Sequence, residues 1–292
     1  MDEWATIGLL GANSLVGECV IGRLRKDGRH TIAFSRQPAE VGTKTGVTWR
    51  KLDGSLSGPP ETHPLRGWVC VAPIWVLPQY FGMLRASGAT RVVALSSTSL
   101  FIKKDSPDRS EQGISLRLAE GEQALRAWAE AHGVEWVILR PTLIYGNGRD
   151  KNVTEIVRFI RRWDFFPLLG QAKGLRQPVH TADVAAACVA ALTGPTAVNR
   201  TYTLSGGETL PYREMVSRIF ATLGKPPHLV TIHRWMFQVA VVLVRRLPRY
   251  KHWTVEMAER MNRDLVFDHA DAARDLGFSP RPFRLSPTDL PV

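Results

Sequence analysis

Three hydroxyl side chains follow one another directly after an apolar run. The run is RVVAL at 91–95, and Ser96, Ser97 and Thr98 come next. A hydroxyl at the end of a strand can hold a substrate oxygen and help to move a proton when a neighbouring group activates it. Small polar side chains at a strand end can equally cap a turn or a helix. The three residues alone leave both interpretations open.

A glycine loop follows the first apolar run. Its sequence is GANSLVG, with Gly11 and Gly17 six residues apart and Ser14 between them. A strand, a tight glycine turn and a helix start form an anion site, because backbone N–H groups and the helix dipole both favour a pyrophosphate. Ser14 stands where a further glycine is usual, and its hydroxyl can cap the helix. The alternative is a strand–turn–helix connection that binds nothing.

The end of the next apolar run bears on which dinucleotide is preferred. Ser35 and Arg36 occupy this position, and no carboxylate follows until Glu40. Sites for NAD place a carboxylate here to hold the ribose 2′-hydroxyl, whereas sites for NADP use an arginine. A guanidinium suits a bidentate grip on phosphate, so NADP is favoured over NAD. Asp53 could meet the adenine amino group or simply occupy a turn.

The elements that would position these residues alternate in type. Strands are predicted at 5–10, 30–34, 47–52, 68–71, 91–95, 134–141 and 201–205. Helices are predicted at 15–26, 114–132 and 181–192. Such alternation builds an α/β fold with a parallel sheet covered by helices on both faces. We expect one domain from 1–145 and 176–205, and a smaller, mostly helical one from 146–175 and 206–292.

Composition limits the classes of protein. The chain has 292 residues, 44% hydrophobic and 22% charged, as is ordinary for a folded protein with a full core. Cys19, Cys70 and Cys188 are far apart and form no CxxC pair. This spacing argues against disulfides and a metal site and favours a cytoplasmic protein. No N-terminal secretory pattern is expected, because Met1 leads almost at once into a strand-like run.

The charge balance indicates an anionic partner. There are 38 Lys and Arg against 27 Asp and Glu, a net charge of +11. No zinc-finger spacing or aromatic RNA-binding motif accompanies this charge, so nucleic acid is not expected. A phosphorylated small molecule remains, as does a membrane or protein surface contacted through 234–253, where Arg and Lys flank an apolar run. The alternative for that run is a buried helix with solvated ends.

The sequence resembles the extended short-chain dehydrogenases/reductases, the NAD(P)-dependent epimerase/dehydratase family. The matching pieces are GANSLVG at 11–17, LSSTSLF at 95–101, LRPTLIYG at 139–146, RQPVHTADVAAA at 176–187, YTLSGGETLPYREM at 202–215 and RDLGFSPRP at 274–282. The resemblance implies a doubly wound (Rossmann) cofactor domain and a C-terminal domain for a substrate, most often a nucleotide-linked sugar. It implies cofactor contacts from Gly11, Asn13, Ser14, Leu15, Val16, Gly17, Ser35, Arg36, Asp53, Ser96 and Pro141.

The chemistry of that family uses a hydroxyl, a Tyr and a Lys, in which the Lys lowers the pKa of the Tyr. Thr98 falls on the hydroxyl position, with Ser97 and Ser99 as near alternatives. The Tyr-x-x-x-Lys pair should open the long helix, but Ile114 and Leu118 stand in its positions. Positioned acid–base catalysis contributes about 10²–10⁴-fold in rate, so the chain must replace the pair or lack the usual activity. The candidate replacements are Tyr145, Lys103, Lys104, Asp105 and Arg117.

Three further residues are candidate substrate contacts. Arg140 and Arg176 suit a diphosphate, and His180 would line the substrate end of the cleft within the resemblance. The alternatives are surface arginines and a structural histidine at a helix start.

We therefore predict an NADP(H)-binding epimerase/dehydratase/reductase-like protein acting on a nucleotide- or lipid-linked sugar. One alternative is a catalytically silent NADPH-binding assembly or regulatory protein that docks on a partner or a membrane. Another is a reductase for a quinone or isoprenoid, for which Ile114 and Leu118 would be suitable neighbours. The sequence predicts no oligomeric state.

Overall fold

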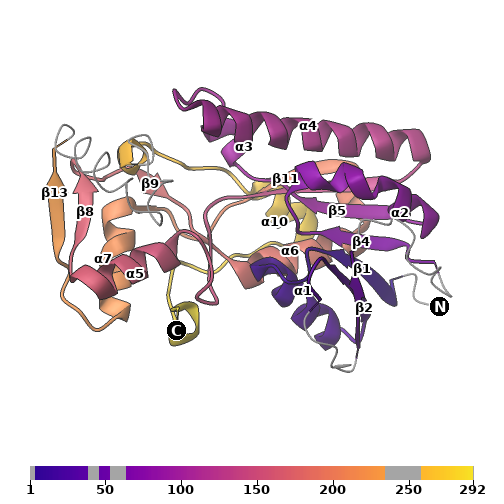
Figure 1. Cartoon of the computed structure of the whole chain (residues 1–292), viewed down its shortest axis with the longest axis horizontal. Coiled ribbons are helices and arrows are strands. Elements are labelled where there is room, and N and C mark those ends of the chain that lie inside the picture. The colour runs from indigo at the N-terminus through magenta and orange to yellow at the C-terminus, as the bar shows by residue number, and fades with distance from the viewer. Residues whose placement is uncertain (1–3, 39–45, 53–63, 234–257, 292) are drawn as a thin grey trace.

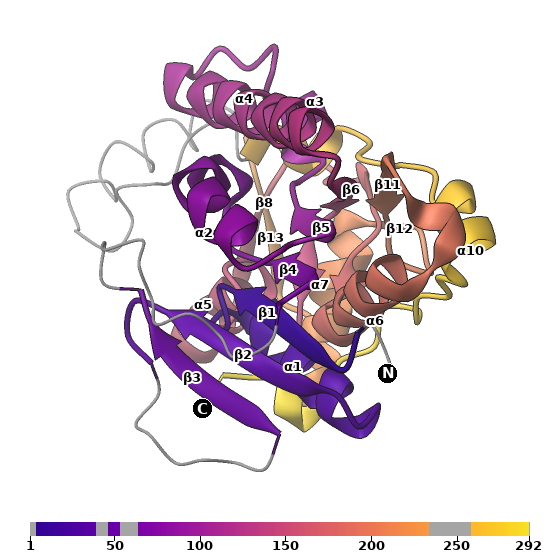
Figure 2. The same cartoon turned by 90° about the vertical axis from the view of Figure 1, so that its right-hand side faces the viewer.

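Seven parallel strands form the central sheet, seen from two sides in the computed structural model (Figures 1 and 2). The structure describes residues 4–38, 46–52, 64–233 and 258–291. In chain order the strands are β1 (Thr6–Leu10), β2 (His30–Ser35), β3 (Val47–Lys51), β4 (Gly67–Cys70), β5 (Arg91–Leu95), β6 (Glu135–Pro141) and β11 (Arg200–Leu204). Their order across the sheet is β11-β6-β5-β4-β1-β2-β3, and every neighbouring pair is parallel.

This strand order confirms the predicted doubly wound α/β fold. From β1 the chain moves outward to β2 and β3, then returns to β4 on the other side of β1. In such sheets, ligands bind at the carboxyl ends of the strands where the direction reverses. Gly11 follows β1 and Ala72 follows β4 at this point, and a Cβ on Gly11 would lie 2.6 Å from the Ala72 amide nitrogen. The glycine loop therefore lies where the fold places a ligand.

The two faces of the sheet bury alternate strand residues. Leu9 belongs to a hydrophobic cluster with α1 (Leu15–Lys26) and α6 (Thr181–Thr193), whereas Leu10 belongs to a second cluster with α2 (Phe81–Ala86) and α4 (Arg109–His132). Successive strand side chains point to opposite faces, so a run of apolar residues can be buried on both. Figure 2 shows α4 and α2 on one side of the sheet and α1 and α6 on the other.

Helix α4 begins earlier than its apolar pattern predicts. The pattern starts near residue 114, whereas the helix begins at Arg109, because Asp108 Oδ1 accepts a hydrogen bond from the Ser110 amide at 2.8 Å. It ends at Gly133, which adopts a φ of 65°. Gly121 allows α4 to pack closely on the turn η1 (Ile74–Tyr80), since a Cβ there would lie 2.9 Å from the Trp75 nitrogen.

A separate hydrophobic cluster lies away from the sheet, at the left of Figure 1. The helices and strands that contribute to it are α5 (Val153–Trp163), α7 (Tyr212–Thr222), β7 (Ile144–Tyr145), β8 (Phe166–Leu169), β12 (Leu210–Pro211) and β13 (Leu229–Ile232). The short strands form pairs: β7 with β10 (Val179–His180), β12 with β9 (Leu175–Arg176), and β13 with β8. The part of the chain that was predicted to be mostly helical thus also contains small two-stranded sheets.

The remaining elements are short. They are α3 (Ser99–Ile102), η2 (Pro195–Ala197), η4 (Arg260–Asn262), α10 (Ala270–Leu276) and η5 (Pro287–Asp289). Asp53 and the run at 234–253 lie outside the described residues. Within the described part of the chain, no helix has the length and apolar character needed to span a bilayer. The described residues also contain no cluster of three or more His, Cys, Asp or Glu side chains suited to a metal.

Candidate functional site

The glycine loop leads into the start of α1 in a tight turn that needs glycine at two positions. Gly11 has a φ of +83°, and a Cβ on Gly17 would lie 2.7 Å from the Ala12 carbonyl oxygen, so both positions need glycine. Ser14 has an ordinary φ of −76°, and its Oγ accepts a hydrogen bond from the Gly17 amide at 3.0 Å. A serine therefore suffices where a further glycine is usual. The amides of Leu15 and Val16 open α1 with no acceptor among the described residues.

The residues after β2 are tied to this loop. Asn13 Nδ2 donates to Ser35 Oγ at 2.8 Å and also to the Gln37 carbonyl, and Ser35 Oγ donates to the same carbonyl at 2.9 Å. Arg36 is exposed, and its guanidinium has no partner among the described residues. The structure thus brings Asn13 and Ser35 together and leaves the Arg36 cation available beside the loop. These residues fit a dinucleotide bound at the glycine loop.

Each of the three hydroxyls after β5 has a hydrogen-bond partner within the protein. Ser96 Oγ donates to Glu122 Oε1 at 2.6 Å, and Thr98 Oγ1 donates to the Pro141 carbonyl at 3.2 Å. Both side chains are buried. Ser97 is half-buried, and its Oγ accepts from the Ser99 amide at 3.1 Å, at the start of α3. Ser97 is therefore the member of the triplet with side-chain surface left for a ligand.

Glu122 is the anion at the centre of this strand end, and the sequence analysis did not identify it. Its side chain, 2% exposed, accepts from Arg140 Nε at 2.8 Å, from Arg140 Nη2, and from Arg126 Nη2 at 3.0 Å. The Arg140 guanidinium carbon also lies 4.9 Å from the centre of the Phe101 ring. Arg140, predicted to contact substrate, is thus held by an internal carboxylate from α4.

The two positions expected to hold Tyr and Lys lie on the core side of α4. Leu118 is 3% exposed and packs in the same cluster as Leu10, while Ile114 is half-buried against that cluster. Of the candidate replacements, Arg117 stacks over the Trp75 ring, with its guanidinium carbon 5.0 Å from the ring centre. Lys103 Nζ lies 3.8 Å from Glu111 Oε1. Burial lowers the pKa of Lys103, and Glu111 only partly offsets this effect.

Tyr145 and His180 lie deep in the fold. The Tyr145 ring is fully buried and meets the His180 ring edge-on at 5.1 Å, and burial raises its pKa to about 12. His180 Nδ1 accepts from the Ala182 amide at 3.1 Å, so its proton must be on Nε2, which donates to Asp289 Oδ1 at 3.0 Å. The imidazole therefore joins the start of α6 to the C-terminal turn η5. This placement gives both residues packing partners rather than an open cavity.

Arg176 is also held by internal partners among the described residues. Its guanidinium donates to the carbonyls of Leu175 and Arg263 at 2.7 and 2.8 Å and to the carbonyl of Arg260. The side chain is buried and lies over the Tyr212 ring. Arg140, Arg176 and His180 are therefore not brought together around one cavity, although Arg176 supports the backbone that carries Arg260 and Arg263.

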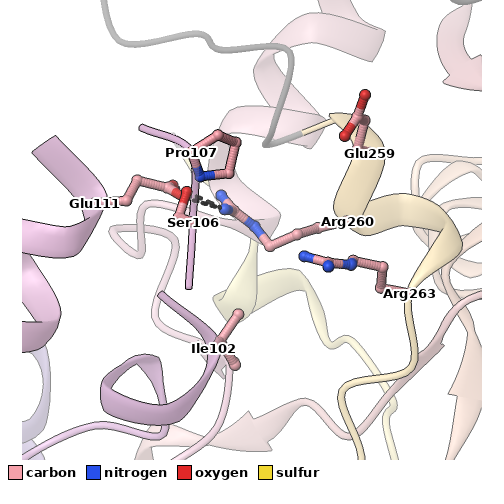
Figure 3. A pocket seen from close by; sticks show the side chains of 7 residues that line it. All are labelled: Ile102, Ser106, Pro107, Glu111, Glu259, Arg260 and Arg263. Atoms are coloured by element: carbon pink, nitrogen blue, oxygen red, sulfur yellow. Dashed lines mark hydrogen bonds and ion pairs between the residues drawn. The ribbon is translucent and has the colours of Figure 1, made fainter. Parts of the chain in front are cut away.

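A cavity of about 400 Å³ lies between α3, the start of α4 and η4 (Figure 3). Arg260 Nη1 donates to both Glu111 oxygens at 2.8 and 2.6 Å, and Ser106 Oγ donates to Glu111 Oε2 at 2.9 Å. Burial alone would raise the pKa of Glu111, but the hydrogen bonds and charge of Arg260 lower it overall. Arg263 also lines the cavity and has no side-chain partner among the described residues.

Arg260 and Arg263 could not be identified as site residues from the sequence. They precede the matching piece at 274–282 and follow a long stretch without a recognisable motif, so their charges carried no positional signal. Figure 3 shows both guanidinium groups extending from the η4 segment toward the loop before α4. The cavity lining thus holds two arginines and two carboxylates, Glu111 and Glu259; Arg263 is exposed, and Arg260 donates to Glu111 through one guanidinium nitrogen.

Comparisons with known proteins indicate the family of this chain. Residues 81–204 match the NAD dependent epimerase/dehydratase family. UDP-glucose 4-epimerase of Vibrio cholerae is 23% identical over 203 residues, which cover 66% of this chain and 60% of that protein. A (4-alkanoyl-5-oxo-2,5-dihydrofuran-3-yl)methyl phosphate reductase of Streptomyces griseus is 30% identical over 237 residues, which cover 74% of this chain and 73% of that protein.

Two further matches differ in kind. The alpha subcomplex subunit 9 of mitochondrial NADH dehydrogenase from Arabidopsis thaliana is 27% identical over 187 residues, 61% of this chain and 45% of that protein. The chain thus matches less than two thirds of the length of this subunit and of the epimerase. The structure of UDP-glucuronic acid 4-epimerase from Bacillus cereus in complex with NAD is similar in fold, with a TM-score of 0.72, 14% identity, and coverage of 97% of this chain and 95% of that one.

Proposed function

Because the chain belongs to the NAD dependent epimerase/dehydratase family, we propose that it binds NADP(H) and acts as an epimerase, dehydratase or reductase on a nucleotide- or lipid-linked sugar. In this proposal, residues 1–145 and 176–205 form the cofactor domain, and 146–175 with 206–292 form the substrate domain. The separate hydrophobic cluster around α5, α7 and β8 supports that division.

The observation that carries the proposal is the glycine loop at the carboxyl ends of β1 and β4. The amides of Leu15 and Val16 would hold the pyrophosphate, and Gly11 and Gly17 keep the space that a side chain would fill. Arg36 would hold the 2′-phosphate, because its cation is unpaired among the described residues and lies after β2. The bound cofactor would supply hydride transfer at its nicotinamide ring.

The cavity beside η4 supports an anionic substrate. UDP-glucose and a methyl phosphate ester, the compounds in the names of two relatives, both carry phosphate. Arg263 would contact this group directly, and Arg260 would offer the nitrogens that Glu111 does not use. Arg176 would act as a positioning residue, since it holds the carbonyls of both arginines.

Proton transfer needs a group other than the usual Tyr and Lys. We propose Lys103, because its half-buried amine lies directly after α3 and burial lowers its pKa. It stands five residues after Thr98. Ser97 would hold the substrate oxygen, as it is the most accessible of the three hydroxyls. Thr98 would position the strand end through its bond to Pro141.

The test is a calorimetric titration of the full chain with NADPH, using two glycine variants of α1. Gly17→Ala places a methyl group against the Ala12 carbonyl, so NADPH affinity should fall at least about tenfold. Gly22→Ala is the matched control, since a Cβ there meets nothing within 4 Å. Equal affinity of both variants, with both folded by circular dichroism, would place the cofactor elsewhere.

A second candidate is an NADPH-binding assembly protein without catalysis. It is favoured by apolar Ile114 and Leu118 at the positions of the usual pair. The Arabidopsis relative is named as a subunit of NADH dehydrogenase. This candidate predicts NADPH binding with no conversion of UDP-sugars or phosphate esters to product and no oxidation of the cofactor in their presence. Turnover that disappears in Lys103→Met would exclude it.

A further inference from the structure

We infer that the substrate is amphiphilic, with a hydrocarbon chain attached to the phosphate or diphosphate that the η4 cavity receives. The occupant would be an isoprenoid or acyl-chain phosphate rather than a nucleotide. This inference rests on the proposed function only in that the same cavity serves the substrate. It concerns the surface next to the cavity, on α3 and on the segment after η4.

Two arginines line the end of the site proposed for phosphate, and they differ in whether the guanidinium has an ion-pair partner. Arg260 uses a single guanidinium nitrogen on Glu111, so its remaining donors have no partner among the described residues. Arg263 is exposed and unpaired within the same part of the chain. Glu111 already accepts hydrogen bonds from Arg260 and Ser106 and lies 3.8 Å from Lys103 Nζ. A phosphate would therefore meet cations without displacing the carboxylate.

The neighbouring surface is apolar. Phe101 is 46% exposed, although it stands in α3 beside the hydroxyl triplet, and Ile102, the next residue, lines the cavity. The Phe101 ring lies 6.2 Å from that of Phe267, which follows Arg263 by four residues. Val266 is also 46% exposed. Phe101 on α3 and Phe267 on the segment after η4, which are distant in sequence, thus lie near each other, and Phe101 is next in sequence to Ile102, which lines the cavity together with two arginines and two glutamates.

These exposed apolar side chains suit contact with a hydrocarbon chain of the ligand better than contact with a nucleobase. Exposed Phe and Val side chains gain most when a hydrocarbon removes them from water. A nucleobase needs hydrogen-bond partners at its edges, whereas the rings of Phe101 and Phe267 and the side chain of Val266 offer none. The reductase relative with 30% identity is named for a substrate that combines an alkanoyl group with a methyl phosphate. That combination matches the two ends of the site.

The experiment compares ligands on the full chain by calorimetry, after NADPH binding has been measured separately. The probes are geranyl diphosphate, inorganic pyrophosphate and UDP. Geranyl diphosphate should bind about tenfold or more tightly than pyrophosphate, because its chain buries the exposed apolar side chains. UDP should bind no better than pyrophosphate. UDP binding more tightly than geranyl diphosphate would overturn the inference.

Variants separate the two ends. Phe101→Ser should remove the advantage of geranyl diphosphate and leave pyrophosphate unchanged, whereas Arg263→Ala should weaken both. Leu116→Ser is the matched control, since Leu116 is 60% exposed on α4 and does not line the cavity. An unchanged advantage in Phe101→Ser would also overturn the inference. Absence of NADPH binding by the wild type would contradict the proposed cofactor. The ligand comparison would still show whether the substrate carries a hydrocarbon chain.

Discussion

Arg260 and Glu111 form a hydrogen-bonded ion pair that joins η4 to the first turn of α4, with the same guanidinium nitrogen 2.8 and 2.6 Å from the two carboxylate oxygens. The two residues are 149 positions apart in the sequence. The pair closes one side of the cavity and draws the C-terminal segment onto the sheet domain. It therefore couples the stability of the fold to the shape of the proposed substrate site.

Removing the carboxylate should cost stability. Glu111→Gln leaves the mostly buried Arg260 cation without its anion, so the free energy of unfolding in urea should fall by about 2–3 kcal/mol. Glu155→Gln is the control, because Glu155 pairs with Arg158 at the surface and such pairs contribute less than about 1 kcal/mol. A loss no larger than that of the control would mean that the Arg260 pair does not hold the segment in solution.

The apolar core face of α4 predicts that a lysine cannot simply be restored at residue 118. Leu118→Lys would bury an ammonium in the hydrophobic cluster, with an expected loss of about 3 kcal/mol or more in unfolding free energy. Leu116→Lys, two residues earlier on the exposed face, should change it by less than about 0.5 kcal/mol. Equal values for the two variants would show that residue 118 faces an aqueous site.

Asp289 should make stability depend on pH at the acidic end. Burial alone would raise its pKa, but hydrogen bonds from His180, Ser286 and Asn147 lower it well below the usual range. A carboxyl with a lowered folded pKa stabilises the protein above its unfolded pKa of about 3.9, and this contribution is lost as pH falls toward the folded pKa.

The corresponding variant is Asp289→Asn. At pH 7 it should lose about 2 kcal/mol of unfolding free energy, and the difference from wild type should stay constant down to about pH 4 and shrink below it. Asp271→Asn on the exposed face of α10 should show no such trend. A difference that grows on acidification would contradict the ionised state of Asp289.

The sheet could be predicted because its strands are buried on both faces. The run VVAL at 92–95 is apolar throughout, and the structure places it in β5, which begins at Arg91. The start of α4 could not be predicted from periodicity, because its first turn, RSEQG, is polar and is held by the Asp108 cap. The glycine loop could be predicted from the sequence because a positive φ and a close backbone approach allow few residue types other than glycine.

The partners of the charged residues were beyond prediction. Arg140 and Arg176 were expected to meet a substrate, but the fold pairs Arg140 with Glu122 and Arg176 with carbonyls at 260 and 263. A sequence shows that a cation is present, whereas its partner is set by tertiary packing between residues 18 to 87 positions apart. Arg260 and Arg263 went unnoticed for the same reason.

The most direct test of the account compares NADPH with NADH in calorimetric titrations of wild type and Arg36→Ala. Arg36 should contribute a charge-assisted grip on the 2′-phosphate, so wild type should prefer NADPH and the variant should lose about tenfold or more in NADPH affinity, with NADH affinity unchanged. Arg25→Ala, an exposed arginine on α1, is the matched control. Equal binding of both dinucleotides by wild type, or no binding of either, would contradict the proposed NADP(H) site.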